Sequence, residues 1–193
     1  MEALKLDASI TALVLIDLQK GIAGRATAPH AAKDVIARAA RLGTACRKAG
    51  GQVVLVRVAF APDGRDRLAP RADEAGWGAQ TPPPDFSELV PELGRQEGDL
   101  VVTKRQWGAF YGTELDLELR RRGIRTILLG GIATNFGVES TARDAYERGY
   151  EQVFVEDAMA AMSAEAHQFA VKTIFPRIGL VRTTDEVLAA LAR

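Results

Sequence analysis

An aspartate, a lysine and a glycine pair each end an apolar run of this 193-residue chain. Asp17 and Lys104 close two of the runs, and the third breaks at Gly130-Gly131. A carboxylate at the end of a buried strand is costly unless it is paired or its pKa is shifted, and a shifted carboxylate can act as general acid or base. A lysine at the same edge could pair with Asp17 and present a cation to a substrate oxygen. Each residue alone has an equally ordinary reading: a helix-capping or loop-binding aspartate, and a lysine whose head reaches water.

The segment after Gly131 combines a strand end, a tight turn and the start of a helical pattern. The first backbone N–H groups of a helix have no intrahelical partner, so such a junction can stabilise negative charge that develops on a substrate. The position on this turn where a nucleophile would be sought is Gly137, which has no side chain. The sequence therefore predicts an oxyanion-binding turn without the group that would attack.

An aromatic and glycine-rich stretch, residues 105–113, follows Lys104 and includes Trp107 and Phe110. Small-molecule pockets commonly have flat apolar walls and a close backbone approach, which this stretch could supply. The alternative interpretation is that these aromatic side chains pack together in the core.

Apolar runs alternate with amphipathic helical patterns along the chain, which predicts one α/β domain, residues 1–193. The expected fold is a three-layer, doubly wound, six-stranded and mainly parallel sheet with helices on both faces. We expect a capping box at the last helix, with Thr183 as cap and Glu186 reaching back. The expected strands are 12–17, 52–60, 100–104, 125–130, 152–156 and 178–181, and the expected helices are about 31–49, 113–122, 136–148, 164–174 and 185–192.

A long stretch between two expected strands, residues 61–91, is rich in proline, glycine and charge. Loops of this length in compact domains are usually lids, binding loops or oligomer contacts. Trp77 in this loop fits a substrate-facing or subunit-facing position as well as packing on the base of the loop.

Composition argues against several function classes. Lysine plus arginine equals aspartate plus glutamate at 25 each, so no net field favours nucleic acid or an anionic membrane. No run is long enough for a membrane span and no secretory leader pattern opens the chain, so we expect a cytoplasmic protein. Cys46 falls on the apolar face of a predicted helix and is expected in the core. His30 and His167 are the only histidines, His167 fits a helix face, and no metal site is expected.

In order and spacing, the chain resembles the isochorismatase-like hydrolase superfamily, also called the cysteine hydrolases, over nearly its whole length. The matching segments are 13–19, Lys104 with 109–113, 131–134, 140–145, 149–150 and 156–158. The resemblance implies a catalytic aspartate at Asp17 and a catalytic lysine at Lys104. It places Gly137 where amide-cleaving members have their nucleophilic cysteine.

The resemblance also implies a cis peptide bond between Ile132 and Ala133, which would direct amides toward the oxyanion. Without a thiolate at position 137, the covalent route to amide cleavage is closed. The resemblance implies no cofactor, a small-molecule substrate and a homo-oligomer, either a dimer or a tetramer. The residues expected to bind substrate are Gln19, Trp107, Phe110, Ile132, Ala133 and Thr134.

The isochorismatases proper carry glycine at this position and hydrolyse a vinyl ether to pyruvate and a dihydrodiol. Asp17 could donate the proton to the vinyl ether carbon if burial raises its pKa, with Lys104 orienting a substrate carboxylate. The turn here, residues 131–135, differs from the Gly-Val-Tyr-Ala-His of isochorismatases, which weakens isochorismate itself as the substrate. The alternatives are a catalytically silent binding or assembly protein and an amidase that uses base-activated water.

Overall fold

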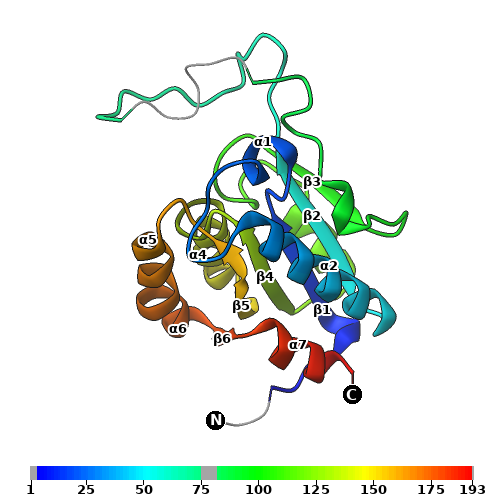
Figure 1. Ribbon diagram of the computed structural model, residues 1–193. Coiled ribbons are helices and arrows are strands. Elements are labelled where there is room, and N and C mark those ends of the chain that lie inside the picture. Colours follow the sequence, from blue (N-terminus) through cyan, green and yellow to red (C-terminus); the bar gives the residue numbers. More distant parts are fainter. Residues whose placement is uncertain (1–3, 75–81, 193) are drawn as a thin grey trace.

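The computed structural model describes residues 4–74 and 82–192 and contains one six-stranded sheet (Figure 1). The strand order is β3-β2-β1-β4-β5-β6, and every neighbouring pair is parallel. The predicted α/β fold with a six-stranded sheet is therefore confirmed. The strands are β1 (Thr11–Ile16), β2 (Gln52–Val58), β3 (Leu100–Lys104), β4 (Thr126–Ile132), β5 (Glu151–Ala160) and β6 (Leu180–Arg182).

Helices cover both faces of this sheet. The apolar cluster on one face contains residues of α2 and α7, and the cluster on the other face contains residues of α3, α4 and α6. The helices are α1 (Lys20–Ala23), α2 (Ala32–Lys48), α3 (Leu115–Arg121), α4 (Glu139–Glu147), α5 (Ala164–Phe169), α6 (Phe175–Ile178) and α7 (Thr184–Leu191). Short 3-10 turns at Ala8–Ile10 and Pro91–Leu93 and π-helical turns at Thr134–Val138 and Ala170–Ile174 complete the regular structure.

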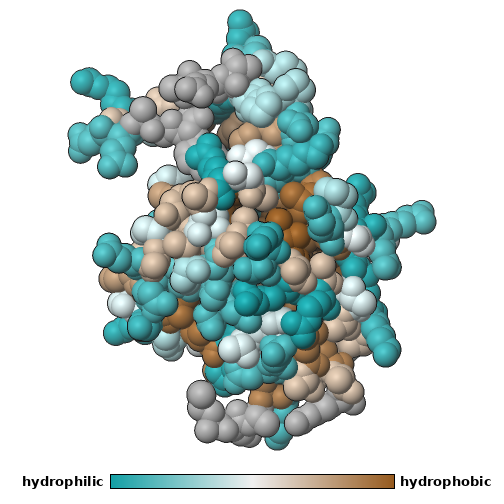
Figure 2. All heavy atoms as spheres, viewed as in Figure 1, coloured by the Kyte–Doolittle hydropathy of each residue, from teal (hydrophilic) through white to brown (hydrophobic). Residues whose placement is uncertain are grey.

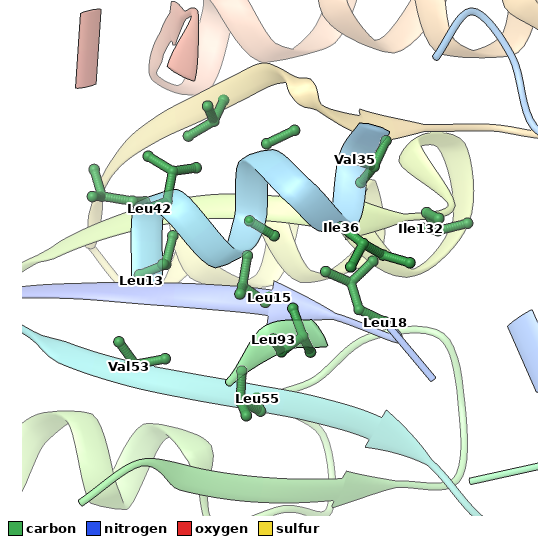
Figure 3. Close-up of a cluster of buried hydrophobic side chains, with 14 of the residues drawn as sticks. Leu13, Leu15, Leu18, Val35, Ile36, Leu42, Val53, Leu55, Leu93 and Ile132 are labelled. Atoms are coloured by element: carbon green, nitrogen blue, oxygen red, sulfur yellow. The ribbon is translucent and has the colours of Figure 1, made fainter. Parts of the chain in front are cut away.

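Strand β1 is buried along its whole length because helices pack against both of its faces. Leu13 and Leu15 point toward α2 and belong to one apolar cluster with Val35 and Leu42 (Figure 3). The alternate residues of β1 belong to the cluster on the opposite face. The outward surface of α2 is mainly hydrophilic (Figure 2), so α2 is amphipathic, as its sequence pattern predicts.

The chain reverses direction across the sheet between β1 and β4. It moves from β1 to β2 and β3 on one side, then returns to place β4 against the other edge of β1. In open parallel sheets, ligands bind beyond the carboxyl ends of the strands at such a switch point. Asp17 and the turn after β4 both lie there.

Most element bounds differ from the sequence predictions by one or two residues, and irregular backbone accounts for three of the differences. Helical structure begins at Thr134, two residues earlier than expected, with the π-helical turn. Strand β5 extends to Ala160, and its register against β4 shifts between Leu129 and Gly131. The short helix α6, which has proline in its first turn, includes Ile178, so β6 starts later than predicted. Hydrophobic runs do not show where a bulge or a short helix interrupts them.

The described part of the long loop after β2 projects from the body at the same end as α1 (Figure 1). Trp77 lies outside the described residues. Over the part of the chain that the structure covers, no helix is long and apolar enough to cross a membrane.

Gly131 is required for the close approach of β4 to β1. Its φ is 121°, and a β-carbon at this position would lie 2.1 Å from the carbonyl oxygen of Ile16. Both the backbone conformation and the lack of space exclude a side chain.

We expect Gly131→Ala to lower the free energy of unfolding by about 3 kcal/mol or to prevent folding, because backbone must move to relieve the clash. Urea unfolding followed by circular dichroism measures this. The matched control is Gly98→Ala, because a β-carbon there meets nothing within 4 Å. Equal stability of the two variants would contradict the structural argument.

Candidate active site

Asp17 and Lys104 form a buried ion pair, although β2 separates their strands in the sheet. Lys104 Nζ donates a hydrogen bond to Asp17 Oδ2 at 2.7 Å and another to the Gln106 carbonyl oxygen at 3.1 Å. The exposed fraction of the side chain is 2% for Lys104 and 7% for Asp17. An ammonium group has three donors, so the third hydrogen of Lys104 remains for a substrate oxygen.

The environment of Asp17 favours its protonated form. Burial raises the pKa of Asp17 to about 6, and the charge and hydrogen bond of Lys104 oppose this increase. Asp17 Oδ1 is buried and has no hydrogen-bond partner among the described residues. One carboxylate oxygen is thus held by Lys104 while the other is available to carry a proton. A carboxyl group with a pKa near 6 can exchange protons with a substrate near neutral pH.

The backbone at Asp17 turns sharply where β1 ends. Its φ of 54° lies in the left-handed region, which aspartate tolerates better than most residues. The backbone N–H of Asp17 still donates to the Val56 carbonyl oxygen of β2 at 2.9 Å. The sheet therefore fixes the main chain from which the carboxylate projects.

Gly137 lies directly beside Asp17. A β-carbon at this position would be 3.1 Å from Asp17 Oδ2, 2.9 Å from Ile16 Cγ2 and 3.4 Å from the Trp107 carbonyl oxygen. A side chain at position 137 would therefore point at the ion pair. The structure places Gly137 together with Asp17 and Lys104, and it places no nucleophilic side chain at this position.

Cys46 is not an alternative nucleophile for this site. It is fully buried in the cluster between α2 and the sheet, as predicted. Burial raises the pKa of the Cys46 thiol to about 11. A protonated and inaccessible thiol does not attack a substrate.

Thr141 holds the glycine turn to the segment after β3. Its hydroxyl donates to the Gly137 carbonyl oxygen at 2.6 Å and accepts from the Ala109 backbone N–H at 3.1 Å. The role of Thr141 was not predicted. The bond to Gly137 has a sequence signal, because a threonine on a helix often donates to the carbonyl oxygen four residues before it.

Trp107 and Phe136 form an aromatic wall beside Gly137. Their ring centroids are 4.9 Å apart, and Trp107 is 62% exposed. A large exposed aromatic ring can cover a flat substrate, and the backbone of Trp107 lies beside Gly137.

Two other residues expected to bind substrate have contacts within the protein. Gln19 donates from Nε2 to the carbonyl oxygens of Val58 and Phe86 and accepts from the Val58 N–H. Phe110 is buried and packs against Tyr150. Gln19 thus ties the chain after β1 to β2 and to the end of the long loop, and Phe110 belongs to the core.

The remaining predicted residues, Ile132, Ala133 and Thr134, form the end of β4 and the start of the turn. The peptide bond between Ile132 and Ala133 is cis, as the family resemblance implies. The Thr134 side chain makes a 2.9 Å hydrogen bond with His167 Nδ1. Burial and the neighbouring His30 lower the pKa of His167 to about 4, so this ring is neutral at physiological pH.

A groove of about 700 Å³ lies elsewhere, along β2, β3 and the segment 88–95, and Asp17, Lys104 and Gly137 are not among its lining residues. Its lining, which includes Arg57 and Arg95, has no acid–base pair comparable to the one described above. The candidate active site is therefore the ion pair of Asp17 and Lys104.

Comparison with known proteins gives consistent matches along the chain. Residues 11–186 match the isochorismatase domain. The isochorismatase family protein YwoC of Bacillus subtilis (strain 168) is 53% identical over 189 residues, which cover 97% of each chain. The ureidoacrylate amidohydrolase RutB of Variovorax paradoxus (strain S110) is 34% identical over 225 residues, covering 99% of this chain and 85% of RutB. The structure of an isochorismatase family protein from Burkholderia thailandensis matches with a TM-score of 0.93 and 45% identity, covering 100% of both chains.

A double-mutant cycle tests the ion pair. We expect Asp17→Asn and Lys104→Met each to lower the free energy of unfolding by about 3 kcal/mol, because each leaves a buried polar or charged group without its partner. The loss of unfolding free energy in the double variant should be smaller than the sum of the two single losses by at least about 1 kcal/mol. Urea unfolding of the four proteins at one pH gives the coupling.

The control cycle uses Arg41→Met and Asp185→Asn, whose side chains form an exposed ion pair at 2.9 Å. There we expect a coupling of less than about 1 kcal/mol. Equal coupling energies in the two cycles would contradict the expectation that burial strengthens the interaction between Asp17 and Lys104.

Proposed function

Because this chain belongs to the isochorismatase family of hydrolases, we propose that it hydrolyses a small anionic metabolite by acid–base chemistry at Asp17, without a covalent cysteine intermediate. The observation that carries this proposal is the position of Gly137, where a β-carbon would lie 3.1 Å from Asp17 Oδ2. An intact Asp–Lys pair with no nucleophilic side chain beside it favours proton transfer and attack by water.

Vinyl ether hydrolysis fits these groups. Protonated Asp17 donates its proton to the terminal vinyl carbon, and the ether carbon becomes an oxocarbenium-like centre. Water attacks that carbon and returns a proton to the Asp17 carboxylate, which gives a hemiketal. Collapse of the hemiketal breaks the bond between this carbon and the former ether oxygen, and the proton of the hemiketal hydroxyl passes to the leaving oxygen, which releases a ketone and an alcohol. Asp17 is regenerated, and one water molecule is consumed.

The electrostatics of the site favour an anionic substrate. When Asp17 carries a proton, Lys104 remains as a buried cation without an opposite charge on its partner. A carboxylate on the substrate can then accept the third hydrogen of the ammonium group. We assign Trp107, Ile132, Ala133 and Thr134 to the walls of the substrate site, because they surround Gly137 or form the turn that carries it.

An amidase that uses activated water is the second candidate. The 34% identity to the ureidoacrylate amidohydrolase RutB favours it. In this reaction, Asp17 would act as a base that removes a proton from the attacking water. The two candidates therefore require opposite protonation states of Asp17.

We further propose that residues 1–193 form one isochorismatase-like domain and that the protein is a cytoplasmic homo-oligomer. Leu68 is 71% exposed on the projecting loop after β2, which supports a subunit contact there. A sedimentation experiment that finds only the monomer at assay concentration would contradict the proposed homo-oligomer.

We expect wild-type protein to release pyruvate from isochorismate, or the corresponding ketone from another carboxylated vinyl ether. Asp17→Asn should lower this turnover by about 10²- to 10⁴-fold, because the proton donor is lost. A coupled assay for the ketone measures release, and the exposed Asp63→Asn variant is the control for a change of the same kind elsewhere. Wild-type activity in Asp17→Asn would refute the mechanism. No turnover of any vinyl ether or amide, with thermal stabilisation by a metabolite, would favour the catalytically silent binding protein.

The pH dependence of kcat/KM separates the two chemistries. With an Asp17 pKa of about 6, a general acid is active below this pH, so kcat/KM should fall about tenfold per unit as pH rises above 6. A general base gives the opposite result, with kcat/KM falling as pH drops below 6. Circular dichroism at each pH controls for unfolding, and a flat profile between pH 5 and 7 would contradict both assignments.

A further inference from the structure

Three side chains that can bind a metal meet near Thr134, the first residue of the turn that carries Gly137. His30 lies before α2, Glu156 is on β5, and His167 is on α5. Their ligand atoms all lie within 4.8 Å of one another, and within the described ranges no other group of three such residues has this geometry. The sequence predicts no metal site, because His167 fits a helix face and His30 is the only other histidine.

The fold brings these residues together by local features. An antiparallel bridge between Ala28 and Ala161 joins the loop before α2 to the end of β5, where Figure 1 shows the two segments crossing. The register shift in β5 falls opposite Leu129–Gly131 and includes Glu156. Ser163 caps α5, its hydroxyl accepting from the Ala166 N–H, and so positions His167 one turn into that helix.

We propose that His30, Glu156 and His167 bind a divalent transition-metal ion, with zinc as the preferred ion. Two imidazole nitrogens and one carboxylate oxygen form a donor set that suits zinc and related ions. The protein then supplies three ligands and leaves a further position for water. His30 and Glu156 are 25% and 31% exposed, so the cluster is open to solvent on one side.

Both imidazoles present an unused nitrogen to this cluster. His30 Nε2 and His167 Nε2 are buried and have no hydrogen-bond partner among the described residues. They lie 3.8 Å and 4.0 Å from Glu156 Oε2, which is too far for a hydrogen bond. Hydrogen bonding within the protein therefore does not explain why the three groups face one another.

Thr134 fixes the orientation of the buried histidine. Its hydroxyl makes the hydrogen bond with His167 Nδ1 at 2.9 Å. If Nδ1 carries the proton and donates to Thr134, Nε2 keeps its lone pair for a metal. Metal-binding histidines usually have such a partner on the second ring nitrogen.

The spacing requires a modest contraction on binding. In a tetrahedral zinc site, metal–ligand bonds of about 2.1 Å place neighbouring ligand atoms about 3.4 Å apart. Binding would therefore require the partly exposed His30 and Glu156 side chains to move toward buried His167.

Metal binding to tag-free, chelator-treated protein tests the proposal. Zinc is titrated in competition with a chromophoric chelator, and cobalt provides a visible spectrum that reports nitrogen and oxygen ligands. The informative variant is Glu156→Gln, which preserves shape and removes the charge. Its matched control is Glu165→Gln, because Glu165 is exposed on α5 next to the cluster.

We expect wild type and Glu165→Gln to bind one zinc ion with equal affinity and to be stabilised thermally by it. Glu156→Gln should bind at least about tenfold more weakly and lose the cobalt spectrum. Should Glu156→Gln fail to fold, His30→Gln replaces it, because His30 lies on a loop. Absence of binding to wild type, or equal binding by a folded cluster variant and by wild type, would overturn the proposal. Neither outcome depends on the reaction proposed for Asp17.

Discussion

The buried ion pair between Asp17 and Lys104 is the constraint on which the site depends. Two charges with almost no contact with water are stable only together. Their strands are not neighbours in the sheet, so the pair spans the end of β2. Lys104 also holds the segment after β3 through its hydrogen bond to the Gln106 carbonyl oxygen. The same burial raises the pKa of Asp17 to about 6. The burial that makes the two charges depend on each other therefore also shifts the protonation equilibrium of the Asp17 carboxyl group.

Glycine at two positions lets the end of β4 approach this pair. Gly131 passes against the backbone of β1 at a distance that no β-carbon could tolerate, and Gly137 stands beside the carboxylate. In the first position glycine is a requirement of packing. In the second, the lack of a side chain has a chemical consequence, because position 137 presents no nucleophilic group to Asp17. Thr141 bonds both the Gly137 carbonyl oxygen and the Ala109 backbone N–H, and so ties these two segments together.

The sequence predicted those features that arise from local patterns. Asp17 and Lys104 could be found because each ends an apolar run, and parallel strands place such ends at one edge of the sheet. The capping box at Thr183 and the burial of Cys46 likewise follow from short spacings and are confirmed. The engagement of Gln19 by main-chain groups of Val58 and Phe86 could not be predicted, because it depends on how the long loop returns to the sheet.

The histidine cluster could not be predicted from the sequence either. His30 and His167 meet because an irregular strand and a bridge between Ala28 and Ala161 bend two segments toward each other, and no residue pattern encodes that meeting. Once formed, the cluster is connected to the candidate active site by Thr134, which bonds His167 and begins the turn that carries Gly137. The position of the His167 ring and that of Gly137 relative to Asp17 are therefore set by one short segment of backbone.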